Sequence, residues 1–346
     1  NPALDIQKFT FINSEVCEGC GDCGITSNCM SIEPLETELG RKRKVNQSSC
    51  NKDFTCVDGF CPSFVTVIGG KLKKPITASL DGPDVEILPL PDLPQIQPNG
   101  YNILCAGIGG TGIVSMSAVL SEAAKIDHIG ASVLDITGLA QKYGAVISHI
   151  RFTPYQSLTG NARLGIGEAD LVIGCDLIVA AGQEALSKMA SGRTYVVANT
   201  DVNPTSEFPK MPDWNPNVEG LLGSLAHRID SQVNSIQASQ IATALMGDAI
   251  AVNFFLLGYA WQLGKVPIRL TSIEKAIEHL GIEVKFNQEC FKWGRKMALN
   301  PEDVKRFANK SMTQPIDEMS AKKLNGYQEI IADRSKRLLI YQDSAY

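Results

Sequence analysis

The sequence of 346 residues predicts an α/β fold, with a mostly parallel sheet and helices on both faces, preceded by a small loop-rich domain. Two observations lead to this prediction. From residue 101 onward, strand-like apolar segments alternate with helix-like segments, which is typical of a parallel sheet covered on both sides. Before that, seven of the ten cysteines lie between residues 17 and 61. The length is sufficient for two domains of ordinary size.

The α/β part is predicted from local periodicity. Short apolar segments indicate buried strands, namely "YNILCAG" from residue 101, "GASVLDITG" at 130–138, "ADLVIGCD" at 169–176 and "RTYVVANT" at 193–200. A glycine turn and an apolar-periodic helix follow the first strand. Further helices are expected near residues 177–189, 238–263, 271–279 and 287–298. No internal repeat is evident in the sequence.

Prolines indicate the boundary between the two domains. Residues 69–99 contain Pro75, Pro83, Pro89, Pro91, Pro94 and Pro98. This density is incompatible with a helix or a central strand. We therefore expect a linker at 69–99, between a cysteine-rich domain at residues 1–68 and an α/β domain that begins at residue 100. We also expect the two domains to be separable.

Composition and charge exclude several classes of function. The formal net charge of -5 provides no basic footprint for nucleic acid. We interpret the short run "RKRK" at 41–44 as a solvated surface, with a docking patch for an acidic protein as the alternative. No apolar run approaches the roughly 20 residues that span a bilayer, and the N-terminus has no apolar signal core. We expect a cytoplasmic protein without membrane contact. Since the chain lacks an initial methionine and ends abruptly, we also expect it to be a piece of a longer protein.

The clustered cysteines indicate a metal centre. They are Cys17, Cys20, Cys23, Cys29, Cys50, Cys56 and Cys61. Disulfides are disfavoured in a reducing compartment, and an odd number cannot all pair. Structural zinc is the second alternative, but it usually takes two CxxC-like pairs separated by a longer loop. A triple of cysteines with two residues between successive members, plus a remote cysteine followed by proline, is typical of iron–sulfur ferredoxins. We therefore favour iron–sulfur chemistry.

One [4Fe–4S] cluster is expected on Cys17, Cys20, Cys23 and Cys61, the last being followed by Pro62. The glycines between these ligands let the backbone curl and direct N–H groups at sulfur; they are Gly19, Gly21 and Gly24. A second cluster is the alternative to a single one. It would use Cys29, Cys50 and Cys56 with a non-cysteine ligand, for which Asp53 is the candidate.

A glycine-rich turn, "GIGGTG" at 107–112, follows the first strand of the α/β domain. Its glycines match the G-x-G-x-x-G dinucleotide fingerprint, and Asp135 ends the next strand, where a ribose-binding acid would lie. The same pattern also occurs in tight turns that bind nothing. A third interpretation is that exposed N–H groups hold another phosphate, such as one of coenzyme A. The candidate cofactor-binding residues are Gly109, Gly110, Thr111 and Gly112.

Several blocks of sequence together carry a family resemblance. They are "CEGCGDCGITSNC", "GRKRKVNQSSCNKDFTC", "GFCPSFVTV", "GIGGTGIVS", "GLAQKYGAVISHIRF", "GCDLIVAAGQEAL" and "MGDAIAVNFFLLGYAWQ". In this order they resemble the fused indolepyruvate ferredoxin oxidoreductases, within the thiamine-dependent 2-oxoacid:ferredoxin oxidoreductase family. The resemblance covers nearly the whole chain. It implies a ferredoxin-like iron–sulfur domain at 1–68, a gamma (pyruvate/ketoisovalerate oxidoreductase) domain at 100–298 and a truncated helical C-terminal segment at 299–346.

The resemblance also implies an activity. In this family, thiamine pyrophosphate attacks a 2-oxo acid, carbon dioxide leaves, electrons pass singly through iron–sulfur clusters to ferredoxin, and the acyl group passes to coenzyme A. The sequence lacks the GDG signature of thiamine sites. We therefore expect thiamine pyrophosphate and Mg to bind parts of the enzyme outside this chain. The implied partners are ferredoxin, thiamine-binding domains or subunits, coenzyme A, and indolepyruvate or another aryl or branched 2-oxo acid, in a dimeric assembly.

Other classes of function stay open at this point. One is an NAD(P)- or flavin-binding electron-transfer module with an iron–sulfur domain, and another is a zinc-stabilised binding module. Under the favoured interpretation the chain binds neither NAD nor flavin, and Gly109 and Gly110 serve a tight turn or a contact across an assembly interface. The histidines show no metal spacing and are expected to be structural; they are His128, His149, His227 and His279.

Overall fold

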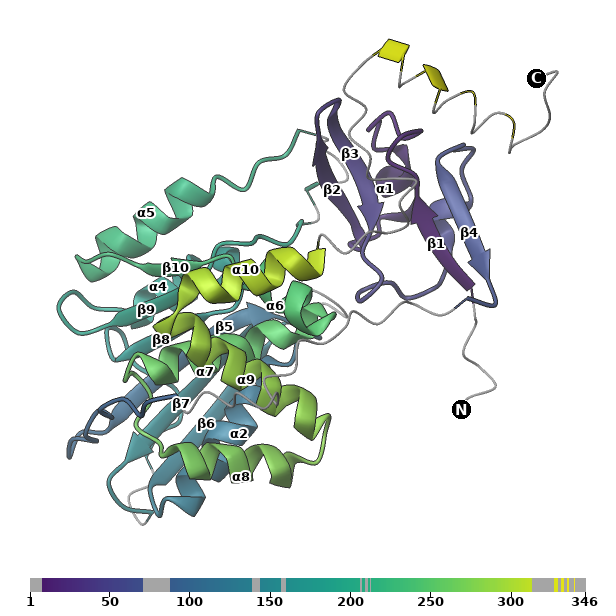
Figure 1. Ribbon diagram of the computed structural model, residues 1–346. Coiled ribbons are helices and arrows are strands. Elements are labelled where there is room, and N and C mark those ends of the chain that lie inside the picture. The colour runs from purple at the N-terminus through teal and green to yellow at the C-terminus, as the bar shows by residue number, and fades with distance from the viewer. Residues whose placement is uncertain are drawn as a thin grey trace.

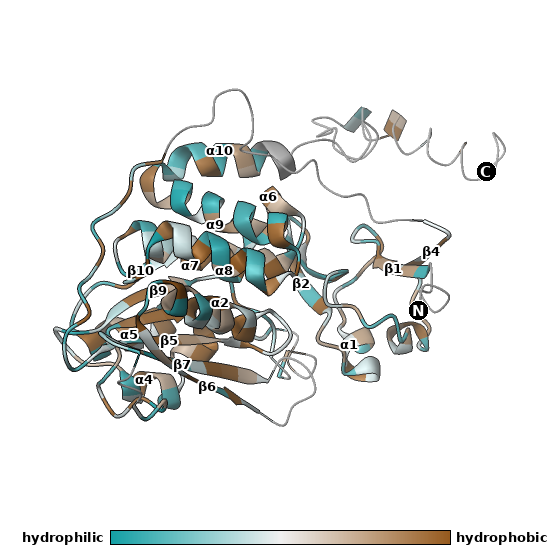
Figure 2. Cartoon of the chain, turned by 90° about the horizontal axis from the view of Figure 1, so that it is seen from below, coloured by the Kyte–Doolittle hydropathy of each residue, from teal (hydrophilic) through white to brown (hydrophobic). Residues whose placement is uncertain are grey.

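The computed structural model describes residues 8–70, 88–138, 144–156, 160–205, 207–208, 211, 213–312 and a few positions between 327 and 339. The described residues form two units, which lie side by side (Figures 1 and 2). We call residues 8–70 the cysteine-rich unit, and the described part of residues 88–312 the α/β unit.

The cysteine-rich unit consists of two antiparallel strand pairs and two short helical turns. Strand β1 (Lys8–Ile12) pairs with β4 (Phe64–Ile68), and β2 (Ile32–Thr37) pairs with β3 (Gly40–Val45). Helix α1 (Asp22–Ser27) and the 3₁₀ turn η2 (Thr55–Val57) contact each other. Within residues 8–70 the buried apolar side chains are Cys17, Ile32 and Cys56. This core is too small to hold the unit together without ligands.

The cysteine-rich unit is an internal repeat. Each position in its first half corresponds to the position 33 residues later in its second half. Strand β1 thus corresponds to β3, helix α1 to η2, and strand β2 to β4. The turn after each first strand is the same: Asn13 Oδ1 accepts from the N–H of Glu15, and Asn46 Oδ1 accepts from the N–H of Ser48, each at 3.0 Å. The expectation of no internal repeat was therefore wrong, because the two halves share backbone geometry while most of their side chains differ.

The α/β unit contains a six-stranded sheet in the order β10-β9-β8-β5-β7-β6. Five strands run in one direction: β5 (Tyr101–Ile108), β6 (Gly130–Thr137), β8 (Leu171–Gly174), β9 (Tyr195–Asn199) and β10 (Asn234–Ile236). Strand β7 (Ala145–Thr153) runs against them, between β5 and β6. The predicted mostly parallel sheet is confirmed, and so are the four predicted strands; β7 and β10 were not predicted.

Helices cover both faces of the sheet, as predicted. Successive residues of β5 face opposite sides, since Ile103 and Cys105 pack into one core and Leu104 into the other. The first core includes residues of α2 (Ile113–Ile126), α6 (Ala238–Met246), α7 (Val252–Gln262), α8 (Leu270–Leu280), α9 (Val284–Leu299) and α10 (Pro301–Met312). The second includes residues of α3 (Leu177–Ala180), α4 (Gln183–Lys188) and α5 (Val218–Ile229). Figure 2 shows the sheet between these two layers.

Two predicted helices are each interrupted. The segment expected at 177–189 is divided into α3 and α4, and the segment expected at 238–263 is divided into α6 and α7, with the 3₁₀ turn η3 (Ala249–Ala251) between them. Gly247 ends α6 in the left-handed conformation, at φ 81°. Helix α5 was not predicted.

Helices α7 and α9 cross in close contact. A Cβ atom on Gly258 would collide with the carbonyl oxygen of Phe291, and one on Gly294 with that of Phe255. All residues of α7 are buried. Among the described helices, none is by itself long and apolar enough to cross a membrane. Helix α6 together with residues 249–262 has sufficient length and apolar composition, but the pair is bent by 120°.

The expected linker at 69–99 lies partly outside the described residues, which omit 71–87. Its described C-terminal end is hydrogen-bonded to the α/β unit. Gln262 Nε2 donates to the carbonyl oxygen of Pro89 at 2.8 Å, and Arg295 Nη2 donates to that of Leu88 at 3.2 Å. The expected segment at 299–346 includes α10, and most of the rest lies outside the described residues. The three boundaries between the four expected segments stay predictions.

Candidate functional site

The first group of cysteines surrounds Cys23, at the start of α1. Burial raises the pKa of the Cys23 thiol to about 11, the cation of Arg43 lowers it, and Cys17 and Cys20 are close enough to raise it further. Cys17 is buried and Cys20 is exposed. The structure therefore brings the three cysteines of the predicted triple together, next to a buried arginine.

The second group surrounds Cys56, in η2. Burial raises the pKa of the Cys56 thiol to about 11, and the neighbouring Cys29, Cys50 and Asp53 raise it further. These four residues are the ones considered for a second cluster. The structure places them together, although they are separated by up to 27 positions in the sequence.

The repeat explains why an aspartate belongs to the second group. Cys17, Cys20 and Cys23 correspond to Cys50, Asp53 and Cys56, so Asp53 occupies the place of the middle cysteine. The middle residue is exposed in both halves. The loops also share two left-handed positions: Gly19 (φ 77°) and Gly21 (φ 86°) correspond to Lys52 (φ 59°) and Phe54 (φ 62°). The spacing C-x-x-D-x-x-C at residues 50–56 is the sequence signal for this correspondence, although the prediction of Asp53 as a ligand did not use it.

Cys61 lies where the two groups meet. A cavity of about 210 Å³ between α1 and the segment after η2 is lined by Cys23, Cys56 and Cys61, among others. The Sγ atom of Cys61 is 3.0 Å from Ser63 Oγ. Because Cys23 and Cys56 both line this cavity, it assigns Cys61 to neither group, and the expected assignment to the first group stays a prediction.

Two buried polar atoms beside the cysteine loops have no hydrogen-bond partner among the described residues. They are Thr10 Oγ1 and Arg43 Nη2, and their side chains occupy corresponding positions in β1 and β3. Buried polar atoms are normally satisfied. No three His, Cys, Asp or Glu side chains in the described part of the chain converge on one metal ion. In an iron–sulfur cube each thiolate binds a different iron, so the ligands of a cluster need not converge on one ion.

The run "RKRK" is only in part the solvated surface that was expected, since Lys44 is exposed but Arg43 is not. Arg43 is 2% exposed, and its guanidinium lies 4.4 Å from the ring centre of Phe208 in the α/β unit. Arg41 Nη1 donates to the carbonyl oxygen of Trp214 at 2.8 Å. The cause is the pairing of β3 with β2, which turns alternate residues inward. Arg41 and Arg43 therefore contact the α/β unit.

The glycine-rich turn is a tight connection between β5 and α2. Gly110 (φ 86°) and Gly112 (φ 97°) adopt left-handed conformations, and the N–H of Gly109 donates to the carbonyl oxygen of Gly144 at 2.8 Å. Gly112 is the N-cap of α2 and offers no side chain to the free N–H groups. Thr111 Oγ1 donates to the carbonyl oxygen of Ile108. The loop is thus compatible with a tight turn, and its N-terminal N–H groups face a cavity.

This cavity has a volume of about 300 Å³ and a mixed lining. Thr111 and Gly112 meet residues of α7 and α9 there, including Asn253, Phe254 and Phe286. Asn253 Nδ2 donates to the carbonyl oxygen of Thr111, and Asn253 Oδ1 has no partner in the described part of the chain. The carboxylates of Asp248 and Glu283 also line the cavity and oppose a phosphate.

Asp135 has a structural environment. Its Oδ1 accepts from Ser117 Oγ of α2 at 2.9 Å and from Ser148 Oγ of β7. Strand β7 separates β6 from β5, whereas a dinucleotide site has these two strands as parallel neighbours. Asp135 therefore ties α2 to the sheet, and the geometry around it differs from that of a ribose-binding acid.

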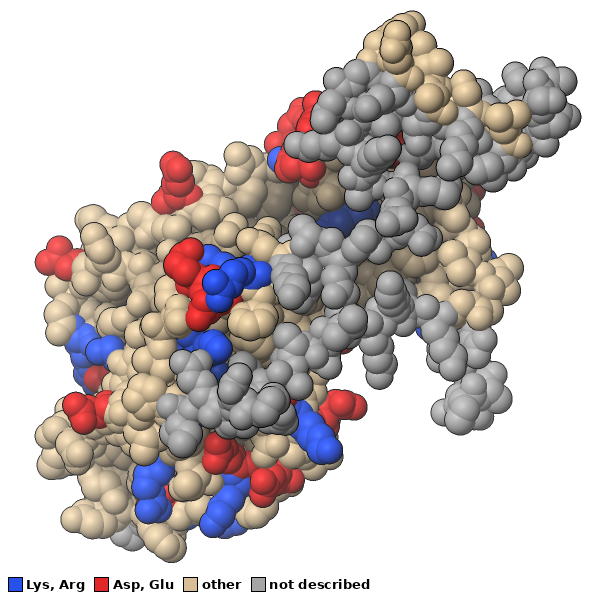
Figure 3. Space-filling model, viewed as in Figure 1, with Lys and Arg blue, Asp and Glu red and all other residues tan. Residues whose placement is uncertain are grey.

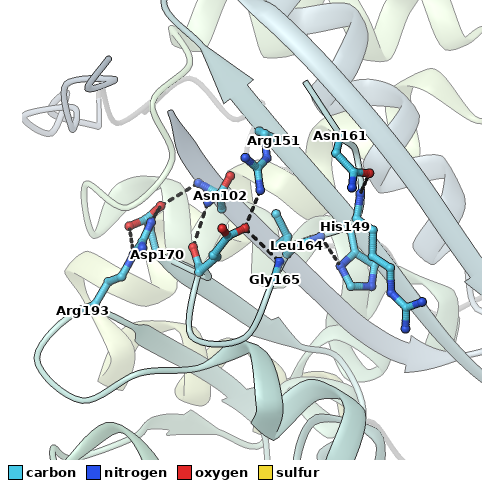
Figure 4. Close-up of polar contacts among 10 residues, drawn as sticks. Asn102, His149, Arg151, Asn161, Leu164, Gly165, Asp170 and Arg193 are labelled. Atoms are coloured by element: carbon cyan, nitrogen blue, oxygen red, sulfur yellow. Dashed lines mark hydrogen bonds and ion pairs between the residues drawn. The ribbon is translucent and has the colours of Figure 1, made fainter. Parts of the chain in front are cut away.

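A polar network lies at the other end of the sheet (Figure 4). Asp170 accepts from the N–H of Asn102 at 2.7 Å and from Arg193 Nε at 2.8 Å. His149 Nδ1 accepts from the N–H of Leu164 at 3.3 Å, and burial lowers the pKa of His149 to about 4. These contacts hold the loop before β8 against the sheet.

Charges of both signs are interspersed on the face shown in Figure 3. This distribution agrees with the negative net charge of the sequence. It offers no continuous basic surface over the described residues of that face.

Comparisons with known proteins concern the α/β unit. The family model for pyruvate ferredoxin/flavodoxin oxidoreductases matches residues 102–297. The indolepyruvate oxidoreductase subunit IorB of Methanothermobacter thermautotrophicus is 31% identical over 173 residues, covering 50% of this chain and 84% of the relative. IorB of Archaeoglobus fulgidus is 26% identical over 207 residues, covering 58% and 96%. The crystal structure of pyruvate oxidoreductase subunit PORC from Thermotoga maritima has a TM-score of 0.40 at 18% identity, covering 57% and 96%.

The match to the family model begins in β5 and ends in α9. It includes the whole sheet, the glycine-rich turn and the two helices that line the 300 Å³ cavity. It covers more than half of the sequence and leaves the cysteine-rich unit as an addition at its N-terminal side. The chain therefore belongs to the pyruvate ferredoxin/flavodoxin oxidoreductase family.

Proposed function

We propose that the chain is the electron-transfer and gamma portion of a thiamine-dependent 2-oxoacid:ferredoxin oxidoreductase. The observation that carries this proposal is the combination of two units. An α/β unit of the family adjoins a repeat that gathers seven cysteines and one aspartate into two groups. A protein that only bound a nucleotide would not need these thiols.

The cysteine-rich unit holds two [4Fe–4S] clusters in this proposal. Cys17, Cys20, Cys23 and Cys61 hold the first cluster. Cys29, Cys50, Cys56 and Asp53 hold the second. The correspondence of the two loops supports both sets, since each combines three ligands of one half with a cysteine near the end of the other. A single cluster on the first set is the alternative.

The clusters supply one-electron transfer when bound. The residues of the chain hold the thiolates in place and limit access of water to them. Cys17 and Cys56 are buried, and the left-handed turns at Gly19 and Lys52 bend the backbone around each group. Metal binding would also stabilise the unit, because only the folded chain holds the thiolates together, so the free energy of binding adds to that of folding.

Substrate and partners follow from the relatives. The curated relatives are named as subunits of indolepyruvate oxidoreductases. By this analogy the complete enzyme oxidises indolepyruvate or another aryl or branched 2-oxo acid, transfers the acyl group to coenzyme A and reduces ferredoxin. Thiamine pyrophosphate and Mg bind partner domains or subunits, and the enzyme is a cytoplasmic dimer of such sets.

The glycine-rich turn has a supporting role in the proposal. Gly109, Gly110, Thr111 and Gly112 make a tight turn that contacts a partner subunit or a phosphate of coenzyme A. Calorimetry with coenzyme A, NADH and FAD tests this role. Micromolar binding of NADH or FAD that is lost in Gly109→Ala would favour the alternative, a nucleotide-binding electron-transfer module.

Anaerobic iron and sulfide analysis tests the main proposal. The full chain should contain about eight iron atoms when both clusters are present, and about four when one is. Cys20→Ala should lose the iron of the first cluster, whereas Cys105→Ala, which changes a buried cysteine of β5, is the matched control and should retain all of it. Stoichiometric zinc without iron, or full iron retention in Cys20→Ala, would contradict the proposal.

A further inference from the structure

Arg43 is a buried cation beside the first group of cysteines. It lies in the middle of β3 and is 2% exposed. Burial lowers its pKa, while the neighbouring Cys23, Cys17 and Cys20 raise it. An arginine remains charged under such conditions. The neighbours of this cation that could become negative therefore include the three thiols of the first group.

The hydrogen bonds of Arg43 are incomplete. Its Nη1 makes a long contact of 3.4 Å to the carbonyl oxygen of Lys42, and its Nη2 has no partner among the described residues. A buried guanidinium with a free N–H group is costly. Sulfur atoms of a cluster held by the adjacent thiolates would accept from such a group.

The α/β unit covers this cation. The ring of Phe208, itself 2% exposed, lies against the guanidinium and excludes water from it. Phe208 packs edge-on against Trp214, whose carbonyl oxygen accepts from Arg41. Since water is kept away, the charge of Arg43 is weakly screened and acts strongly on its neighbours.

The second group of cysteines has no such cation at the corresponding place. Thr10 is the counterpart of Arg43 in β1, and it is buried and neutral. Asp53 stands where the first group has Cys20, and its carboxylate carries the same charge as the thiolate it replaces. At this buried position the two groups therefore differ by one unit of charge, that of Arg43.

We propose that Arg43 raises the reduction potential of the first cluster above that of the second, so that a transferred electron rests on the first. The reason is electrostatic, because the reduced cluster carries one more negative charge and the nearby cation stabilises it. In the transfer the second cluster loses one electron and the first gains it, without any change in bonds or protons. This inference rests on the proposed function, since it requires clusters in both groups.

The test is a dithionite titration of the full chain, followed by electron paramagnetic resonance, with iron content measured for each variant. Arg43→Gln removes the charge, and Arg43→Lys retains it without the planar N–H fork. Lys44→Gln is the matched control, because Lys44 is the next residue on the opposite, exposed side of β3. All four proteins are compared at the same iron content.

The expected result is a selective change. In Arg43→Gln the equilibrium for reducing one cluster should shift at least tenfold toward the oxidised form, which is about 59 mV for one electron. Arg43→Lys should show a smaller shift, and Lys44→Gln none. Equal potentials in the wild type and Arg43→Gln at full iron content would overturn the inference. So would loss of iron from both Arg43 variants, which would assign Arg43 a purely structural role. Failure of the proposed function is distinguishable, because the wild type itself would then lack iron.

Discussion

The two units of this chain are stabilised in different ways. The α/β unit has two apolar cores on either side of its sheet, with side chains such as Trp261, Phe255 and Leu104 fully buried. The cysteine-rich unit buries little apolar surface within residues 8–70 and instead gathers thiols. Packing therefore accounts for the α/β unit, whereas the cysteine-rich unit depends on the proposed ligands, and the two units should respond to different perturbations.

The cysteine-rich unit contains a second comparison of the same kind. Its two halves follow the same backbone path, with different residues at corresponding positions. The first half uses glycines where the second has Lys52 and Phe54, and a cysteine where the second has Asp53. Backbone geometry has thus been retained while the charge and the ligand chemistry differ.

Removal of iron is the perturbation with the largest expected effect. Anaerobic chelation should unfold the cysteine-rich unit, because its small core cannot offset the entropy of ordering. The α/β unit should keep its helical circular dichroism and its cooperative melting. Limited proteolysis should then cut within residues 8–99. Loss of the α/β melting transition together with the iron would show that the two units are not independently stable.

Gly19→Ala and Lys52→Gly compare corresponding left-handed positions of the two halves. A Cβ atom at Gly19 would collide with the carbonyl oxygen of Arg41, in addition to the cost of about 1–2 kcal/mol for a left-handed alanine. Gly19→Ala should therefore lose iron from the first cluster. Lys52→Gly should retain its iron, because glycine tolerates the same φ. Equal iron retention in both variants would show that the two turns are not under the same constraint.

The pH dependence of stability should distinguish the α/β unit. Because burial lowers the folded pKa of His149 to about 4, the unfolded state binds the proton more tightly below pH 6.5. Stability is therefore complete above pH 6.5 and falls as the pH drops toward 4, by about 3 kcal/mol in total. Denaturant unfolding of the α/β unit measures this loss. His149→Gln, which retains an acceptor for the N–H of Leu164, should flatten the profile; an unchanged slope would assign the loss to other groups.

Asp53→Cys should have the smallest effect on stability. It tests whether the two halves differ because of this one ligand position. It gives the second loop the cysteine that the first loop has, so both clusters would have four thiolates. We expect unchanged iron content and an altered electron paramagnetic resonance signal of one cluster. The second cluster should also lose less iron on mild oxidation than in the wild type, because thiolate binds iron more strongly than carboxylate does. A spectrum identical to that of the wild type would exclude Asp53 as a ligand.

The sequence by itself determined the features that depend on local pattern. Apolar periodicity located β5, β6, β8 and β9, and the glycine turn located the start of α2. The spacing of Cys17, Cys20 and Cys23 indicated a metal centre, and the ordered blocks indicated the family that residues 102–297 match. These signals are readable because they arise between residues a few positions apart.

Only the tertiary structure decided the features that depend on pairing over long separations. The antiparallel insertion of β7 between β5 and β6 moved Asp135 against Ser117 and Ser148. The pairing of β1 with β4 and of β2 with β3 showed the repeat and turned Arg43 inward beneath Phe208, and the folded unit brought Cys29 next to Cys56. Strand order, and the identity of the residue that covers a given side chain, follow from the free energy of the whole packed chain, so no short stretch of sequence contains them.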